Sequence, residues 1–325
     1  MRSTGCAPGT CAARPSSCCD PGVPRARTIV AAAAVLLALS GLLAGPASAL
    51  PPGRSGMYGG GAVSGYMQFV SLRVTPGGTF TSHATLVTRC SPRFGDELTE
   101  SITVRNAPLT AAGRYSATSS FTDDVDPGVP LTGGMHAEGT ISFSARVLAG
   151  GLARGTVRVR TKYSRSRGGA VVSSCDTGSI AWTARRPPAD AGTGLHRLQP
   201  GTHRGATGQD EPFLMRVVDR GRMVRRAGLT VRVDCGSAIG LPLDVVAQRV
   251  RVRRGRFAAG GDFDRPYTGP DGRRVVEHYA WELRGRFGRR GARGTFEMTG
   301  VVRRRSDGRR VGSCATGTID WRAAR

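Results

Sequence analysis

The chain has 325 residues, of which 39% are apolar and 22% charged, a balance that excludes an intrinsically disordered polyampholyte. Its 47 glycines and 19 prolines favour many turns and short strands over long helices. The net charge of +24 excludes an acidic protein, yet Lys162 is the only lysine and Asn106 the only asparagine. Both residue types need codons that begin with AA, so part of the arginine excess reflects a GC-rich genome.

The first 49 residues are typical of a leader. Arg25 and Arg27 precede an apolar run over 28–44, and Ala47-Ser48-Ala49 follows it. This order predicts a secretory signal peptide cleaved after Ala49, although the length of the run would also allow an uncleaved membrane anchor. Residues 1–22 hold four cysteines and no periodicity, so we expect translation to start later, with Val23 as a candidate.

An internal repeat organises the rest of the chain. Ala-Arg-Gly-Thr occurs at 153–156 and 292–295, and each copy is followed by Cys-x-Thr-Gly-x-Ile-x-Trp-x-Ala. Further upstream, the matching pairs are Gly-Arg-Tyr at 113–115 with Gly-Arg-Phe at 255–257, Cys90 with Cys235, and Gly-x-Tyr at 56–58 with Gly-x-His at 201–203. The sequence therefore predicts a first repeat over 50–186, a linker over 187–200 and a second repeat over 201–325.

The strand pattern within each repeat has a period of two. In chain order, we expect strands at 68–74, 79–89, 114–121, 141–147, 157–159 and 179–184, with equivalents in the second repeat. Seven or eight short strands with glycine-rich turns predict an all-β fold: two tandem antiparallel β-sandwich or barrel-like domains. The order of the strands does not follow from the sequence.

Four cysteines remain in the mature chain, two in matching places in each repeat. Although four cysteines allow three pairings, the repeat selects Cys90–Cys175 and Cys235–Cys314. A metal site would need closer cysteine spacing and nearby histidines, so we predict no metal and no cofactor.

Basic side chains form the main candidate binding sites. Residues 50–186 carry a net charge of +7 and residues 187–325 a net charge of +14. Alternation predicts one ladder of cations on a strand face in each repeat, and such ladders suit polyanions. The ladders do not recur at matching positions, which argues against a shared role. Their members are Arg249, Arg251 and Arg253 in the second repeat, and Arg158, Arg160 and Lys162 in the first.

Aromatic residues provide a second candidate surface. Trp182 and Trp321 share strand parity with neighbouring isoleucines, so we expect them in the core rather than on a sugar-binding platform. Trp281 aligns with outward-facing Ser142 at an offset of 139, which makes it a candidate exposed aromatic.

Acidic and histidine residues give little evidence for catalysis. Asp123, Asp124 and Asp126 in one repeat, and Asp262 and Asp264 in the other, are interpreted as turn residues, with calcium binding or a carboxylate pair as alternatives. The five histidines are scattered, and the sequence has no recognisable hydrolase motif.

The ordered motifs Gly-x-Tyr, Cys, Gly-Arg-Phe, Ala-Arg-Gly-Thr and Cys-x-Thr-Gly-x-Ile-x-Trp resemble repeats in secreted proteins of high-GC actinobacteria. The resemblance covers most of residues 54–325 and implies export, but it implies no activity. His203 departs from the aromatic residue usual at that place.

The leading expectation is an exported, non-catalytic protein of the cell envelope or medium with a binding or structural role. An alternative is binding of an anionic wall polymer or nucleic acid through the second repeat, with nucleic-acid binding non-specific at most. A carbohydrate-binding module and a hydrolase are further alternatives, in that order. No membrane span is expected in the mature chain, and the oligomeric state stays open.

Overall fold

The structure is a computed structural model that describes residues 50–51, 53–64, 66–91, 98–125, 134–194, 199–235, 241–268 and 273–325. The predicted signal peptide and the candidate start at Val23 lie outside the described residues. Within these ranges, no helix has the length and apolar character needed to span a membrane.

The first repeat forms one antiparallel sheet. Its strands are β1 (Gly56–Ser64), β2 (Tyr66–Val74), β3 (Thr79–Ser91), β4 (Leu98–Pro108), β5 (Arg114–Asp124), β6 (His136–Leu148), β7 (Leu152–Ser164), β8 (Val171–Asp176) and β9 (Ile180–Arg185). A 3₁₀ turn, η1 (Ala149–Gly151), joins β6 to β7.

The second repeat forms a sheet of its own. Its strands are β10 (Gly201–Thr207), β11 (Pro212–Val218), β12 (Met223–Val233), β13 (Leu241–Arg251), β14 (Arg256–Thr268), β15 (Arg274–Gly288), β16 (Gly291–Arg304), β17 (Arg310–Ala315) and β18 (Ile319–Ala324). A 3₁₀ turn, η2 (Asp219–Gly221), lies between β11 and β12.

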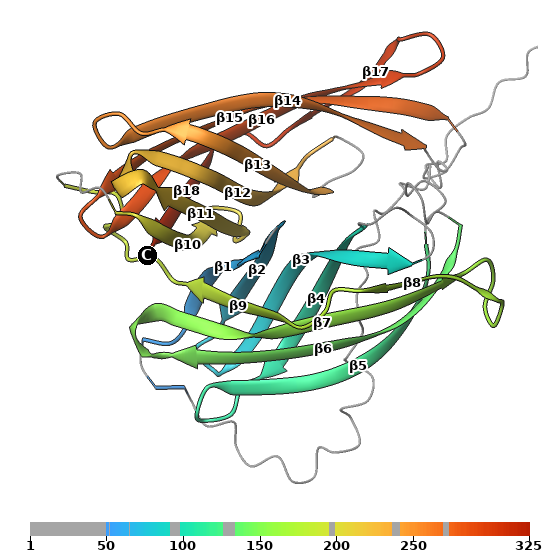
Figure 1. The fold of residues 1–325 in the computed structure, drawn as a ribbon, viewed down its shortest axis with the longest axis horizontal. Coiled ribbons are helices and arrows are strands. Elements are labelled where there is room, and N and C mark those ends of the chain that lie inside the picture. The colour runs from blue at the N-terminus through green and yellow to red at the C-terminus, as the bar shows by residue number, and fades with distance from the viewer. Residues whose placement is uncertain are drawn as a thin grey trace, which may run out of the picture.

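The two sheets have the same topology. The strand order is β4-β3-β2-β1-β9-β7-β6-β5 in the first and β13-β12-β11-β10-β18-β16-β15-β14 in the second, so each strand of one matches a strand of the other. In the first sheet, β8 pairs with both β3 and β7 and so joins its two halves. Each sheet curls into a barrel-like domain (Figure 1). The prediction of two all-β tandem domains is confirmed.

Alternating side chains fill each barrel. In β7, Ala153, Val157 and Val159 are buried, whereas Arg154 and Arg160, at the alternate positions, are exposed. Buried aromatic rings dominate both cores, because each ring covers a large apolar area. Trp182 and Trp321 are 2% and 1% exposed, as the strand parity predicts.

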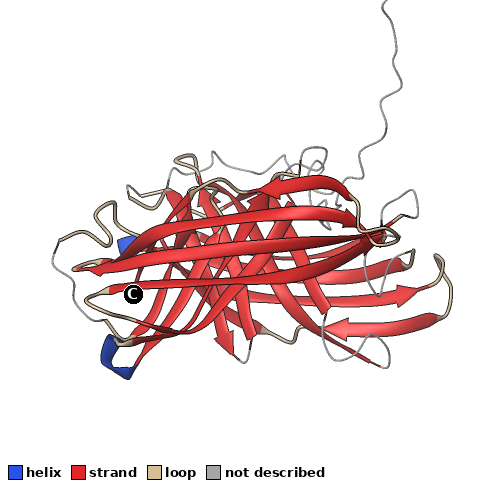
Figure 2. Cartoon of the chain, turned by 90° about the horizontal axis from the view of Figure 1, so that it is seen from above, coloured by secondary structure: helices blue, strands red, loops and turns tan. Residues whose placement is uncertain are grey.

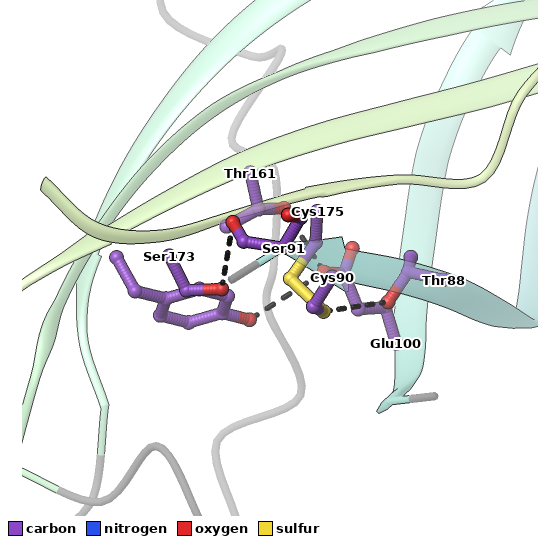
Figure 3. Close-up of a disulfide and its surroundings, with 8 residues drawn as sticks. Thr88, Cys90, Ser91, Glu100, Thr161, Ser173 and Cys175 are labelled. Atoms are coloured by element: carbon purple, nitrogen blue, oxygen red, sulfur yellow. Dashed lines mark hydrogen bonds between the residues drawn. A yellow bond between two sulfur atoms is a disulfide. The ribbon is translucent and has the colours of Figure 1, made fainter. Parts of the chain in front are cut away.

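Both predicted disulfides are present. Cys90 on β3 lies directly opposite Cys175 on β8, and Cys235, just after β12, is joined to Cys314 on β17. Figure 3 shows the first bridge beside the Glu100 and Thr161 side chains. The bridges join residues 85 and 79 positions apart, and closing loops of this length stabilises a fold by about 4–5 kcal/mol in the chain-entropy account.

The segment between the repeats packs against the second barrel. Ala191 is fully buried, and Gly192 contacts the Arg293 side-chain stem on β16. The Thr193 carbonyl accepts a hydrogen bond from the Arg289 backbone. Residues 191–193 of the predicted linker are therefore held against the second barrel.

The two barrels touch through their first strands. A methyl group on Gly59 of β1 would overlap the Gly205 carbonyl of β10, so only glycine permits this approach. Beside this crossing, Met67, Phe69 and Leu214 form an apolar cluster between the barrels. Figures 1 and 2 show the consequence: β1 and β2 face β10 and β11, and the molecule is one elongated body.

The interface predicts that replacing two apolar side chains separates the barrels without unfolding them. Phe69 and Leu214 belong to neither barrel core, and burying each stabilises the interface by about 1.5–3 kcal/mol. We expect Phe69→Ser with Leu214→Ser to retain the β-rich circular dichroism spectrum and to increase the radius of gyration in solution scattering. The exposed pair Val171→Ser with Val311→Ser is the control. An unchanged radius of gyration in the first variant would contradict this interface.

Candidate anion-binding site

Five arginines stand side by side across the second barrel. Arg253 is bridged to Arg256, and the strand register then places Arg256 opposite Arg286, Arg286 opposite Arg293, and Arg293 opposite Arg322. The row thus runs from the β13–β14 turn across β14, β15, β16 and β18, perpendicular to the strands. We call these five residues the arginine row.

Side-chain alternation places the arginine row on the outer face of the barrel. The adjacent cross-strand set is Phe257, Gly285, Gly294 and Trp321, and its two rings are buried. A β-carbon on Gly294 would come within 2.7 Å of the Trp321 indole, so the two glycines let the rings pack flat against the inside of the sheet. Because these residues point inward, their neighbours Arg286 and Arg293 point outward.

The arginine row lines a pocket of about 740 Å³. Arg251 and Arg284 bring the number of arginines in its lining to seven, and Asp320 is its one carboxylate. Arg284 is ion-paired with Glu282. In the described part of the chain, by contrast, no member of the arginine row forms a side-chain hydrogen bond or an ion pair.

Like charges on directly opposed residues repel each other. Neighbouring strands are about 4.8 Å apart, so five adjacent arginines span about 19 Å. A linear row of unpaired guanidinium groups provides closely spaced donors for phosphate or carboxylate oxygens, and its repulsion is relieved when an anion binds.

The second-repeat ladder predicted from the sequence is partly retained. Arg251 and Arg253 line the pocket, and Arg253 belongs to the arginine row. Arg249 has a φ of 53°, and the alternation of buried residues changes there: Val245 and Ala247 are buried before it and Val250 after it, while the register with β12 is continuous. Arg249 therefore lies at an irregular point of β13, and three guanidinium groups on one regular strand face are not observed.

Two members of the first-repeat ladder share one carboxylate. Arg158 donates two hydrogen bonds to Asp176, at 3.0 and 2.6 Å, and Arg160 donates one at 3.2 Å. The Arg158 bonds, together with contributions from Gly178 and Arg160, lower the Asp176 pKa to about 2. Only Lys162 of this ladder remains exposed without such a partner in the described residues.

Trp281 is not the exposed aromatic expected from the alignment. It packs against the second core and stacks with Phe296, with ring centroids 6.4 Å apart. The turn between β15 and β16 is one residue shorter than its counterpart, so Trp281 pairs with Met298 as Ile141 pairs with Val159. The correct offset is therefore 140, and it places Trp281 on the inward-facing parity.

The acidic residues interpreted as turns lie mostly in strands. Asp123 and Asp124 end β5, whereas Asp262 and Asp264 lie inside β14. Asp124 and Asp264 accept hydrogen bonds from His136 and His278 respectively. Asp126 lies outside the described residues, and within them no group of three or more acidic, histidine or cysteine side chains is arranged to hold a metal ion.

Sequence reasoning missed four members of the arginine row: Arg256, Arg286, Arg293 and Arg322. Arg256 and Arg293 are part of the repeated Gly-Arg-Phe and Ala-Arg-Gly-Thr motifs, which were read only as landmarks. The motifs alone do not show that these arginines meet, because strand order brings them together. A comparison of the chain with family models, curated proteins and solved structures finds no match.

The first barrel holds a buried carboxyl group, that of Glu100 near the start of β4. Glu100 is 4% exposed and accepts hydrogen bonds from Thr161 and Tyr163. Burial raises the pKa of Glu100 to about 7, although both hydrogen bonds act in the opposite direction. Thr161 and the Cys90–Cys175 disulfide lie beside this carboxyl group (Figure 3).

The repulsion within the arginine row predicts a stabilising substitution. Arg286 lies between Arg256 and Arg293, so Arg286→Thr removes two like-charge pairs and we expect about 0.5–1 kcal/mol of added stability at low salt. The gain should shrink in 1 M salt because exposed charges are screened. Urea unfolding at both salt concentrations checks this. A destabilised variant at low salt would contradict the repulsion.

The raised pKa of Glu100 predicts that the free energy of unfolding falls as the pH rises. Because its folded pKa is raised from 4.5 to about 7, the folded state binds the proton more tightly than the unfolded state. Its stabilising contribution is therefore full below pH 4.5 and is lost as the pH rises to about 7, a change of about 2–3 kcal/mol. Glu100→Gln should remove this dependence in urea unfolding between pH 4.5 and 7. Parallel curves for the two proteins would contradict the assignment.

Proposed function

We propose that the chain is an exported, non-catalytic protein that binds an anionic polymer of the cell envelope through the arginine row. The observation that supports this most strongly is the run of five opposed arginines without carboxylate partners among the described residues. A fold gains nothing from such a row in the absence of a ligand, since opposed like charges destabilise a sheet.

The shape of the arginine row favours a linear ligand. A single phosphate group contacts two or three guanidinium groups, whereas a row of about 19 Å has room for several successive anionic groups. Arg251 widens the row at one end. An extended polymer crossing the strands would therefore use the row more fully than a small anion.

The ligand we favour is a sugar-phosphate polymer of the wall rather than a nucleic acid. Proteins that hold single-stranded nucleic acid stack bases on aromatic side chains between their cations. Here the aromatic residues nearest to the row, Phe257 and Trp321, are 5% and 1% exposed. The same burial weighs against a carbohydrate-binding platform, which needs an exposed ring.

Retention on isolated cell-wall material across a salt series tests the proposal. For the mature chain from Leu50, we expect a plot of the logarithm of the binding constant against the logarithm of the salt concentration to have a slope of about −3.5, since each of five phosphate contacts with a flexible polymer contributes about −0.7. The triple variant Arg256→Ser, Arg286→Ser and Arg293→Ser should reduce the slope by about 2 and weaken retention at least tenfold at low salt.

The matched control removes three exposed arginines elsewhere in the same barrel: Arg305→Ser, Arg309→Ser and Arg310→Ser. It changes the net charge equally, so it should retain near wild-type binding. Equal losses in the two triple variants would show that only overall charge matters and would contradict the proposal. Cell walls stripped of phosphate polymer should retain little protein. If single-stranded DNA displaces the protein from walls better than polyphosphate does, the ligand is a nucleic acid instead.

A further inference from the structure

We propose that the first repeat holds a second anion site at the equivalent position, and that the two sites let one molecule join two anionic polymers. Cross-linking rests on the function proposed above, whereas the second site has its own residues. These are Arg114, Arg146 and Arg154, which we call the first-repeat row.

The first-repeat row has the same construction as the arginine row. The register places Arg114 opposite Arg146 and Arg146 opposite Arg154, as it does for Arg256, Arg286 and Arg293. Trp182 again lies beneath a glycine, here Gly155. The three arginines, the indole and the glycine thus recur as one unit, unlike the ladders predicted from the sequence.

The pocket at the first-repeat row differs in chemistry. It also measures about 740 Å³, but its lining has three arginines, no carboxylate and five serine or threonine side chains: Thr110, Ser116, Ser144, Thr156 and Thr183. The Arg146 Nε is buried without a hydrogen-bond partner. In the described residues, none of the three arginines has an ion pair. Guanidinium and hydroxyl donors together suit the oxygens of a phosphate group.

The two sites face away from each other. The barrels meet through strands β1, β2, β10 and β11. Strands β5–β7 of the first barrel and β14–β16 of the second lie on opposite outer sides of the molecule (Figure 1). The apolar cluster of Met67, Phe69 and Leu214 and an ion pair between Arg73 and Asp210 join the barrels. Because each row lies on its own barrel, we expect a second polymer to be able to occupy the first-repeat row while the arginine row is filled.

A bridging assay with inorganic polyphosphate tests the inference. Full-length mature protein is captured on immobilised polyphosphate, washed, and then offered fluorescent polyphosphate in solution. We expect wild type to retain the soluble polymer. The variant Arg114→Ser, Arg146→Ser and Arg154→Ser should still be captured through the arginine row, but it should retain at least tenfold less fluorescence per captured molecule.

The matched control is Lys162→Ser, Arg165→Ser and Arg167→Ser, three exposed cations in the same barrel, and it should bridge like wild type. Intact disulfides and a single cooperative melting transition, no lower than that of wild type, show that each variant is folded. Wild-type bridging by the first-repeat variant would overturn the inference and leave the proposed function standing. Failure of wild type to be captured on polyphosphate at low salt would overturn both.

Discussion

Backbone pairing among β14, β15, β16 and β18 determines where the side chains of the candidate site lie. Each arginine of the row points outward from its own strand because side chains alternate, and only the register makes the five arginines neighbours. Packing of Phe257 and Trp321 against Gly285 and Gly294 holds that register from inside, because a one-residue slip would turn both rings outward. The core and the candidate site therefore depend on the same pairing.

This arrangement trades stability for a charged surface. Other arginines of the chain are neutralised locally: Arg158 and Arg160 share Asp176, and Arg232 pairs with buried Glu211. The arginine row lacks such partners in the described residues, although Glu282 and Glu297 lie four residues from Arg286 and Arg293 on the same strands. A high arginine content set by codon usage explains how arginines arose at these places. It does not explain why three opposed positions are arginine in both repeats.

The sequence predicts the fold well and the site poorly. Matching cysteines and period-two alternation were enough for two disulfide-linked β domains, because both are local patterns. The site depends on strand order, which brings together residues as distant as Arg256 and Arg322. Small irregularities also misled the predictions. Arg249 has a positive φ where the buried alternation of β13 changes, and the shortened β15–β16 turn shifts the alignment at Trp281 by one residue.

The most direct measurement is NMR observation of the arginine Nε–Hε groups while short polyphosphate is added to the mature protein. The account predicts that the resonances of Arg256, Arg286, Arg293 and Arg322 shift first and together, with those of Arg114, Arg146 and Arg154 following, and that Arg305, Arg309 and Arg310 change little. Uniform small shifts across all exposed arginines would contradict it, since they would show that the polymer follows net charge and not the cross-strand register.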